Sequence, residues 1–545
     1  MNFMINETAQ KLRGGYYTPD ILTKFIIRYA VTKRNDLILE PSCGDGAFIK
    51  AINSVCSQNC INFTGIELDA NEADKARQQL CLSNIDGEII TYDFLNWYLD
   101  NSHLKNSFDA VIGNPPFIRY QYLSSNMQKL AENIFNQLEL KFTKHTNAWI
   151  AFVIASIDLL KPEGRIGMVI PSEIFNVIYA QSLREYLGKT CLEITIVDPD
   201  DIWFESTLQG AVILLAKKKN NDSETTNGLG VIRVKGFDFC NENPNSLIKN
   251  INRINGKTIA GKWTNAFLEK DEYSLYCNLK NDINIKHFSD IAEADVGIVT
   301  GANDFFLVNQ ETVEKYELHE FSHPMFGRSD HCPGILYSKD VHQANLEKGL
   351  PTSFLWFNSN FNDLTKKQQE YIKIGECQNL QSRYKCRMRS PWYTVPSVYS
   401  TKIGMLKRSH ELPRLILNKI GAFTTDTAYR IKSNYINNEL LVYCFINSLT
   451  ALSAELEGRS YGGGVLELVP SEINQLLIPI ADIKKPDLNE LDRMVRTKNP
   501  DVYLPVLDNI ILGSIGISKR EQRLLFNAWL KLKNRRQRKN LINFD

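Results

Sequence analysis

The first 215 residues alternate short runs of β-forming residues with helical stretches, and this alternation restricts the fold more than any other feature. Helical patterns lie between the runs, as at 47–55 and 148–160. Strands that alternate with helices predict a mostly parallel, doubly wound sheet with helices on both faces. We therefore expect an α/β domain. Its strands are expected at 37–40, 63–68, 88–94, 108–114, 166–171, 192–198 and 210–219.

The alternation stops after a polar segment, KKKNNDSETTNG (217–228), which has the composition of a surface loop or linker. Beyond it, aromatic-rich runs, short helical patterns and Gly/Pro turns predict a mixed α+β domain. The last stretch, ISKREQRLLFNAWLKLKNRRQRKN, is helical in pattern and ends in a basic cluster. A chain of 545 residues has room for both domains. We set their limits at 1–235 and 236–545.

The composition excludes several classes of protein. Hydrophobic residues make up 43% and charged residues 23%, which is typical of globular proteins and not of disordered or collagen-like chains. The eleven cysteines include no CxxC pair, so we expect neither a metal site nor a disulfide framework. The longest apolar run, 148–160, is too short to span a bilayer, and the N-terminus has no apolar core like that of a secretory signal. A reduced, cytoplasmic protein is expected.

Acidic residues and a glycine turn follow the predicted strands, where doubly wound sheets bind their ligands. The first strand ends at Glu40 in the turn PSCGDG, whose glycines allow the backbone to approach a ligand closely. The second ends at Glu67, suited to a ribose diol, and the third at Asp93-Phe94, suited to an adenine. Singly, each feature also fits a simple turn or a helix N-cap. Together, without GxGxxG or GxxxxGK[ST], they predict a nucleoside site that lacks a phosphate clamp, as S-adenosylmethionine (SAM) requires.

The fourth strand ends in Asn114-Pro115-Pro116-Phe117. Two prolines remove two backbone N–H donors and leave carbonyls free to accept. A side-chain amide oxygen beside a fixed carbonyl makes an acceptor pair for an NH2 group, and the adjacent ring can stack on a planar base. Two acceptors draw the amine nitrogen towards sp3 character, so that it can attack a sulfonium methyl in line. This pattern favours methylation of an exocyclic amine without a covalent nucleophile.

With these motifs in this order, the chain resembles the gamma-type DNA N6-adenine methyltransferases, the TaqI-like and Eco57I-like modification enzymes. The resemblance implies that residues 14–19 (GGYYTP) contact the methionine end of SAM. It also implies that Phe117 stands where tyrosine is more usual, that Phe152 lies against the cofactor adenine, and that Phe204, or Trp203 beside it, stacks on the flipped base. The cofactor-binding residues carried over from the family are Tyr17, Thr18, Glu40, Ser42, Gly44, Gly46, Glu67, Leu68, Asp93, Phe94 and Phe152.

The second domain carries further family-like segments, at 296–306, 389–393 and 458–479, which resemble the target-recognition region. Chemistry on a base requires flipping it out of the duplex, so this domain is expected to contact phosphates and base edges. For each candidate, and for the basic C-terminal helix, a solvated or structural charge is the competing interpretation. The DNA-binding candidates are Lys385, Arg387, Arg389, Arg414, Arg459 and Tyr461.

The sequence leaves other substrates open. The NPP tetrad also serves enzymes that methylate RNA bases or the glutamine amides of proteins, although about 300 residues after the linker favour DNA. The chain could also be the methylase part of a restriction–methylase assembly, but no PD-(D/E)xK pattern occurs in a strand context. We expect a prokaryotic modification enzyme that binds SAM and double-stranded DNA and does not bind a membrane. It is expected to act as a monomer and to protect DNA against a separately encoded restriction endonuclease.

Overall fold

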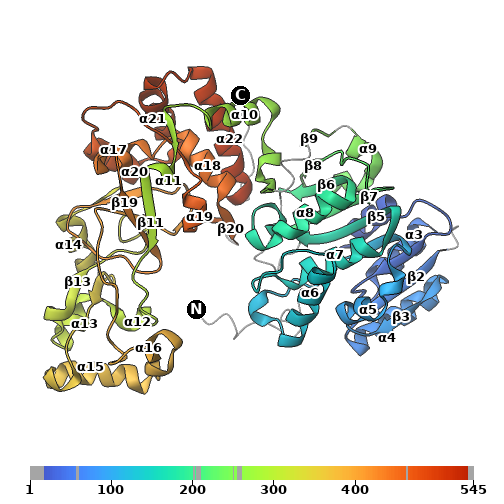
Figure 1. The fold of residues 1–545 in the computed structure, drawn as a ribbon, viewed down its shortest axis with the longest axis horizontal. Coiled ribbons are helices and arrows are strands. Elements are labelled where there is room, and N and C mark those ends of the chain that lie inside the picture. Colours follow the sequence, from blue (N-terminus) through green and yellow to red (C-terminus); the bar gives the residue numbers. More distant parts are fainter. Residues whose placement is uncertain are drawn as a thin grey trace. The chain divides into compact units, whose positions relative to one another are not determined.

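The computed structural model describes residues 18–56, 61–200, 203, 210–249, 251–254, 261–461 and 464–537. These residues form two compact units (Figure 1). Unit 1 ends at Phe267, and unit 2 extends from Leu268 to Gln537.

A nine-stranded sheet forms the centre of unit 1, with the strand order β3-β2-β1-β4-β5-β7-β6-β8-β9. Strands β1 to β5 run parallel to one another, whereas β7 is antiparallel to both β5 and β6. The doubly wound sheet expected from the sequence is therefore confirmed, with an antiparallel strand inserted towards one edge. The strands are β1 (Leu37–Glu40), β2 (Asn62–Glu67), β3 (Asp86–Thr91), β4 (Phe108–Gly113), β5 (Leu160–Pro171), β6 (Cys191–Pro199), β7 (Ala211–Lys218), β8 (Leu229–Val234) and β9 (Arg253–Ile254).

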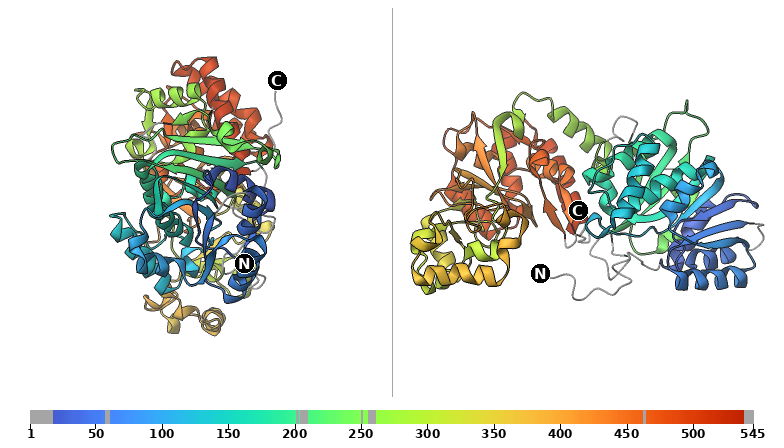
Figure 2. Two further views of the ribbon diagram at one scale, coloured as in Figure 1. Left: turned by 90° about the vertical axis from the view of Figure 1, so that its right-hand side faces the viewer. Right: turned by 60° about the horizontal axis from the view of Figure 1, so that its bottom comes forward.

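Helices cover both faces of this sheet (Figures 1 and 2). Helices α2, α3 and α4 pack in series on one face, and α5, α6, α7 and α8 on the other. All twelve residues of α7 are buried because the helix is apolar on every side, which places it at the centre of its layer. The helices are α2 (Asp20–Ala30), α3 (Ala47–Val55), α4 (Ala70–Ser83), α5 (Phe94–Asp100), α6 (Ser125–Gln137), α7 (Ala148–Leu159), α8 (Gln181–Thr190) and α9 (Pro244–Lys249).

Unit 1 continues past residue 235, the limit set from the sequence. The polar segment 217–228 joins β7 to β8 inside this unit, so it is a surface loop and not a connection between units. Strand β8 pairs with β6, and the ring of Phe239 packs edge-on against Phe25 of α2 at 5.0 Å. Phe267 closes the unit with its ring 4.7 Å from that of Phe175. The alternation of strands and helices ends here, but the residues that follow still pack into unit 1.

Unit 2 mixes sheets and helices, as the sequence predicts. Its largest sheet has the order β11-β19-β16-β18-β14, and smaller sheets have the orders β12-β15-β13, β17-β21-β20 and β10-β22. The strands are β10 (Ile285–His287), β11 (Ala292–Val296), β12 (Leu307–Val308), β13 (Ser322–Pro324), β14 (Leu336–Tyr337), β15 (Ser353–Leu355), β16 (Ile403–Leu406), β17 (Arg408–Ser409), β18 (Leu415–Asn418), β19 (Ala428–Ser433), β20 (Arg459–Tyr461), β21 (Val465–Glu467) and β22 (Leu477–Pro479).

Short helices connect these strands, and a helical cluster ends the unit. Among the described residues no single helix is both long and apolar enough to cross a membrane; one bent pair, α17 with α18, meets that test by length and composition. The helices are α10 (Lys270–Leu279), α11 (Phe288–Ile291), α12 (Asn303–Phe306), α13 (Gln310–Lys315), α14 (Lys339–Glu347), α15 (Lys366–Cys377), α16 (Tyr384–Arg387), α17 (Asn438–Cys444), α18 (Ser448–Glu457), α19 (Pro470–Ile473), α20 (Leu488–Thr497), α21 (Pro500–Ser514) and α22 (Lys519–Gln537).

The basic helix α22 uses its charges inside unit 2. Arg536 forms an ion pair with Glu455 of α18 at 2.7 Å, and both side chains are 3% exposed. Lys533 contacts Asp501 and Glu411 at 2.6 and 3.1 Å and is 4% exposed. Because buried charges must be paired, these residues fasten the helix to the unit. For Lys533 and Arg536, the structural interpretation of the basic helix is therefore the one that the geometry supports.

Replacing Glu455 by Ala should destabilise unit 2 by about 3–5 kcal/mol, because Arg536 would remain buried without its carboxylate. Urea unfolding followed by circular dichroism measures the change. Glu490→Ala, which breaks an exposed pair with Arg493 on α20, is the matched control and should alter stability far less. Equal stability of the two variants would contradict the role of the buried pair.

Candidate active site

Four predicted site segments meet at one edge of the sheet in unit 1. Strands β1, β2, β3 and β4 are parallel neighbours, so their carboxyl ends point the same way. Glu40 and Glu67 are the last residues of β1 and β2, and Asn114 directly follows β4. A Cβ atom placed on Gly113 would lie 3.6 Å from Cγ of Glu40, so the first and fourth strand ends are adjacent.

A hydrogen bond to Glu67 fixes the glycine turn that follows β1. Gly44 and Gly46 have φ of +51° and +89°, a region that glycine enters without strain, and Gly46 is the N-cap residue of helix α3. The backbone N–H of Gly44 donates to Glu67 at 2.9 Å, and the N–H of Asp69 donates to the other carboxylate oxygen at 2.8 Å. A carboxylate has about four lone-pair positions, so two remain for ligand hydroxyl groups. The adjacent Leu68 is 63% exposed, an apolar side chain open to the same edge.

Glu40 is buried, and its Oε2 atom has no hydrogen-bond partner among the described residues. Burial raises the pKa of Glu40 well above its usual value, and the nearby Glu67 and Asp45 raise it further. A buried carboxyl without a partner is costly unless a ligand supplies a donor. Glu40 therefore suits a ligand that brings an ammonium group or another positive charge.

The third strand end combines a cap with an aromatic pair. Asp93 caps helix α5, accepting from the N–H of Asn96 at 2.9 Å, as a simple N-cap does. Phe94 follows it and is buried, with its ring 5.1 Å from that of Phe152 on α7. Phe94 begins α5 and Phe152 lies on α7, so the two rings meet across two elements. The expected adenine-side residues Asp93, Phe94 and Phe152 lie together.

The tetrad Asn114–Phe117 leaves β4 beside two other predicted segments. The side-chain amide of Asn114 donates to the hydroxyl of Thr18 at 3.2 Å, which brings the end of the GGYYTP motif to the tetrad. The hydroxyl of Ser42 donates to the backbone carbonyl of Asn114 at 3.1 Å, which ties the glycine turn to it. Phe117 is half-buried and packs against the core of unit 1. Thr18, the glycine turn and the tetrad thus form one site.

Two expected residues, Tyr17 and Phe204, lie outside the described residues. Trp203, the alternative to Phe204, is 8% exposed and stacks on Phe237 and Phe239 at 6.3 and 6.0 Å. The geometry supports a core role for Trp203.

Three of the basic candidates in unit 2 bind other groups of the same unit: Arg389 and Arg414 bind backbone carbonyls, and Arg459 binds a carboxylate. Arg389 donates to the carbonyls of Val299 and Thr300, each at 2.7 Å. Arg414 donates to the carbonyls of Cys332 and Gly334. Arg459 pairs with the buried Glu472 at 2.8 Å. These three guanidinium groups thus stabilise unit 2. Tyr461, the remaining candidate in this segment, is the last residue of β20.

Lys385 and Arg387 are different, because they are exposed on α16. Both cations lie over the ring of Tyr384, at 5.6 and 5.3 Å. Tyr384 and Met388 are 63% and 71% exposed, and neither was expected from the sequence because isolated exposed apolar residues carry no motif. We name residues 384–388 the α16 patch.

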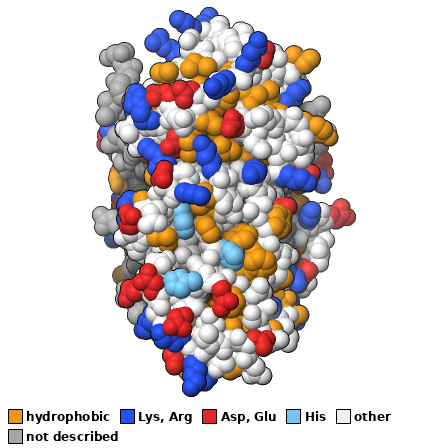
Figure 3. All heavy atoms as spheres, turned by 90° about the vertical axis from the view of Figure 1, so that its left-hand side faces the viewer, with side chains coloured by type: hydrophobic (Ala, Val, Ile, Leu, Met, Phe, Trp, Pro, Cys, Tyr) orange, Lys and Arg blue, Asp and Glu red, His pale blue; other side chains and the backbone are white. Residues whose placement is uncertain are grey.

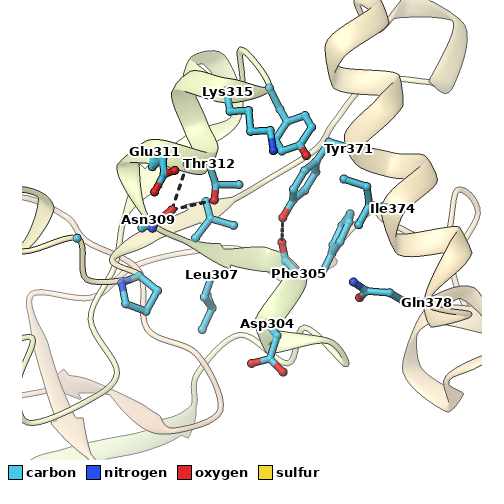
Figure 4. A pocket seen from close by; sticks show the side chains of 14 residues that line it. Asp304, Phe305, Leu307, Asn309, Glu311, Thr312, Lys315, Tyr371, Ile374 and Gln378 are labelled. Carbon is cyan, nitrogen blue, oxygen red and sulfur yellow. Dashed lines mark hydrogen bonds between the residues drawn. The ribbon is translucent and has the colours of Figure 1, made fainter.

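Two cavities in unit 2 contain none of the expected site residues. One, of about 580 Å³, lies beside Phe305 and Tyr371, and the Tyr371 hydroxyl donates to the carbonyl of Phe305 (Figure 4). The other, of about 610 Å³, is lined in part by Arg328, Lys407 and Arg408. On the face shown in Figure 3, basic, acidic and apolar side chains are interspersed, so charge alone marks no path for DNA there.

Comparison with known proteins decides the family. The model for N-6 DNA methylases matches residues 2–295. The chain belongs to the N-6 DNA methylase family. The model for the C-terminal domain of the type II methyltransferase M.Eco57I matches residues 260–512 of this family member.

Two relatives of this N-6 DNA methylase have low sequence identity to it but match most of its length. Type II methyltransferase M.AccI of Acinetobacter calcoaceticus is 25% identical over 530 residues, which cover 91% of this chain and 93% of that protein. Type II methyltransferase M.HindII of Haemophilus influenzae is 24% identical over 395 residues, covering 68% and 70%. The solved type IIG restriction endonuclease BpuSI is 14% identical, with a TM-score of 0.44, covering 96% of this chain and 67% of that one.

Replacing Gly44 by Ala should weaken SAM binding while the protein stays folded. Apart from Gly44 and its two chain neighbours, no described residue has an atom within 4 Å of the added Cβ, so the methyl group would enter the space of the site. The left-handed backbone adds a strain of about 1–2 kcal/mol. Isothermal titration calorimetry with SAM measures the effect.

Gly236→Ala is the matched control, because Gly236 has φ of +59° and equally open space. It should lose similar stability and keep its SAM affinity. Unaltered SAM affinity in Gly44→Ala would contradict the placement of the cofactor.

Proposed function

We propose that this N-6 DNA methylase transfers the methyl group of SAM to N6 of an adenine flipped out of a short duplex DNA site. The observation that carries the proposal is the tetrad Asn114–Phe117 at the end of β4, tied by hydrogen bonds to Thr18 and Ser42. Family membership supports the same reaction.

The residues at the sheet edge fit SAM by their chemistry. Glu67 has acceptor capacity for the ribose hydroxyls, and Leu68 and Phe152 offer apolar surface to the adenine. Glu40 offers an unpaired buried carboxyl oxygen to the positively charged methionine end. SAM, when bound, supplies an electrophilic sulfonium methyl group.

Asn114 and the prolines hold the target amine. The carbonyl of Asn114 already accepts from Ser42, so we assign the next carbonyl, that of Pro115, as the second acceptor beside the side-chain amide oxygen of Asn114. These two acceptors bind the two N–H bonds of the adenine amine and raise the nucleophilicity of its nitrogen. Phe117 stacks on the base, and we assign Phe204 to its other face.

Replacing Asn114 by Ala should reduce methyl transfer by on the order of 10²–10³-fold, because one of two acceptors is lost at the reacting amine. SAM binding and DNA binding should change little. Transfer of tritiated methyl groups to unmethylated bacterial genomic DNA measures the rate, and mass spectrometry of the nucleosides identifies the product. Undiminished turnover would refute the catalytic assignment, and N4-methylcytosine as the product would refute the target base.

The α16 patch is our candidate for DNA contact in unit 2. Lys385 and Arg387 can neutralise phosphates, and the exposed Tyr384 and Met388, one on each side of this pair in the sequence, can pack against sugars or bases. Arg389 anchors the patch to Val299 and Thr300, within the family-like segment 296–306. The side chains of Tyr384, Lys385, Arg387 and Met388 are thus exposed, while the hydrogen bonds of Arg389 hold the segment in place.

The double variant K385E/R387E should weaken DNA binding and reduce the slope of log K against log salt by about 2. Fluorescence anisotropy with duplex DNA at several salt concentrations measures both. K339E/K348E makes the same charge change at exposed positions at α14 and should have a smaller effect. Equal losses in the two double variants would contradict a specific role for the α16 patch.

We further propose that the protein is the modification enzyme of a restriction–modification system with a separately encoded endonuclease, and that it acts as a monomer. The relatives that are named type II methyltransferases and match most of the chain support the role in modification.

A further inference from the structure

Helix α7 holds the segment that follows the catalytic tetrad. Asn147 is the N-cap residue of α7, is 5% exposed, and its amide oxygen accepts from the backbone N–H of Tyr120 at 2.9 Å. The N–H of Ala148 donates to the carbonyl of Ile118 at 3.1 Å. Two hydrogen bonds therefore fix the chain within three residues of Phe117.

The amide group of Asn147 is oriented by two residues that follow β5. Its nitrogen donates to the hydroxyl of Tyr179 at 2.7 Å and to the carboxylate of Glu173 at 3.2 Å. The Tyr179 hydroxyl donates to the same carboxylate oxygen. Because both acceptors face the nitrogen, the amide oxygen must face Tyr120.

The loop that carries Glu173 is itself fixed. Ile174 and Phe175 are buried, and Arg184 of α8, also buried, donates to the carbonyls of Ile174 and Val177 at 3.0 Å each. Burial raises the pKa of Glu173, while its bonds from Tyr179 and Asn147 and the charge of Arg119 oppose the rise. The carboxylate is a rigid acceptor at the carboxyl end of β5.

We propose that Glu173, Tyr179 and Asn147 form a positioning network that sets the place of Asn114–Phe117 for the target base. The inference rests on the proposed function. The three side chains act through the backbone of residues 118–120 and need not touch substrate. A displacement of about 1 Å at a reacting group costs on the order of 10²-fold in rate, so such support has catalytic weight.

Asn147→Asp tests the network, because it sets a second carboxylate against Glu173 and removes the donor between them. The rate of methyl transfer from tritiated SAM to unmethylated bacterial genomic DNA should fall on the order of 10²-fold at pH 8, with the loss in kcat rather than KM. Two adjacent carboxylates raise the pKa of one of them. The rate of this variant should therefore recover as the pH falls, since the shared proton restores a donor.

The second variant, N147D/E173Q, exchanges the acid and the amide. The glutamine then donates to the aspartate, whose other oxygen accepts from Tyr120, so most of the lost rate should return without the pH dependence. Asn437→Asp, at the exposed N-cap of α17, is the matched control and should keep the wild-type rate. Thermal unfolding and SAM titration show whether each variant is folded and loaded.

A wild-type rate in Asn147→Asp would overturn the network while leaving the proposed function intact. A double variant no faster than Asn147→Asp would also overturn it, because a role in folding alone predicts no rescue by the exchange. Absence of methyl transfer by the wild-type protein would overturn the proposed function, and the network with it.

Discussion

The parallel alignment of β1, β2, β3 and β4 is the constraint on which the site depends. It brings the carboxyl ends of four strands, distant in the sequence, to one edge of one sheet. The contact from Gly44 to Glu67 then couples the glycine turn to the second strand, and Ser42 couples it to the tetrad. Each of these polar contacts joins residues that belong to different motifs, so the motifs work only as a set.

The sequence predicts this half of the protein well for physical reasons. A buried parallel strand has a near-continuous apolar run and ends in a polar turn, so β1 and α3 were predicted with the bounds found in the structure. The third strand ends earlier than expected, because Asp93 acts as a helix cap. The extension of unit 1 to Phe267 was not predicted, since β8, β9 and the aromatic packing that follows show no βα alternation.

Side-chain roles in unit 2 were harder to predict. In the sequence, the structural arginines cannot be told apart from the exposed cations Lys385 and Arg387. The structural arginines bind carbonyls or a carboxylate from distant segments; they are Arg389, Arg414 and Arg459. The network of Asn147, Tyr179 and Glu173 escaped detection for the same reason: its members form no motif and meet only after α7 and β5 have packed. Local patterns reveal which strands form, whereas long-range contacts decide which charges remain free.

Direct sequencing of modified bases tests the central claim most sharply. The protein would be expressed in a bacterial host that lacks DNA methylation, and its genomic DNA compared with that from a host expressing Asn114→Ala. The account predicts N6-methyladenine at one recurring short motif with the wild-type protein and far less of it at that motif with the variant. Unmodified DNA from cells that contain the folded, SAM-binding wild-type protein would contradict it.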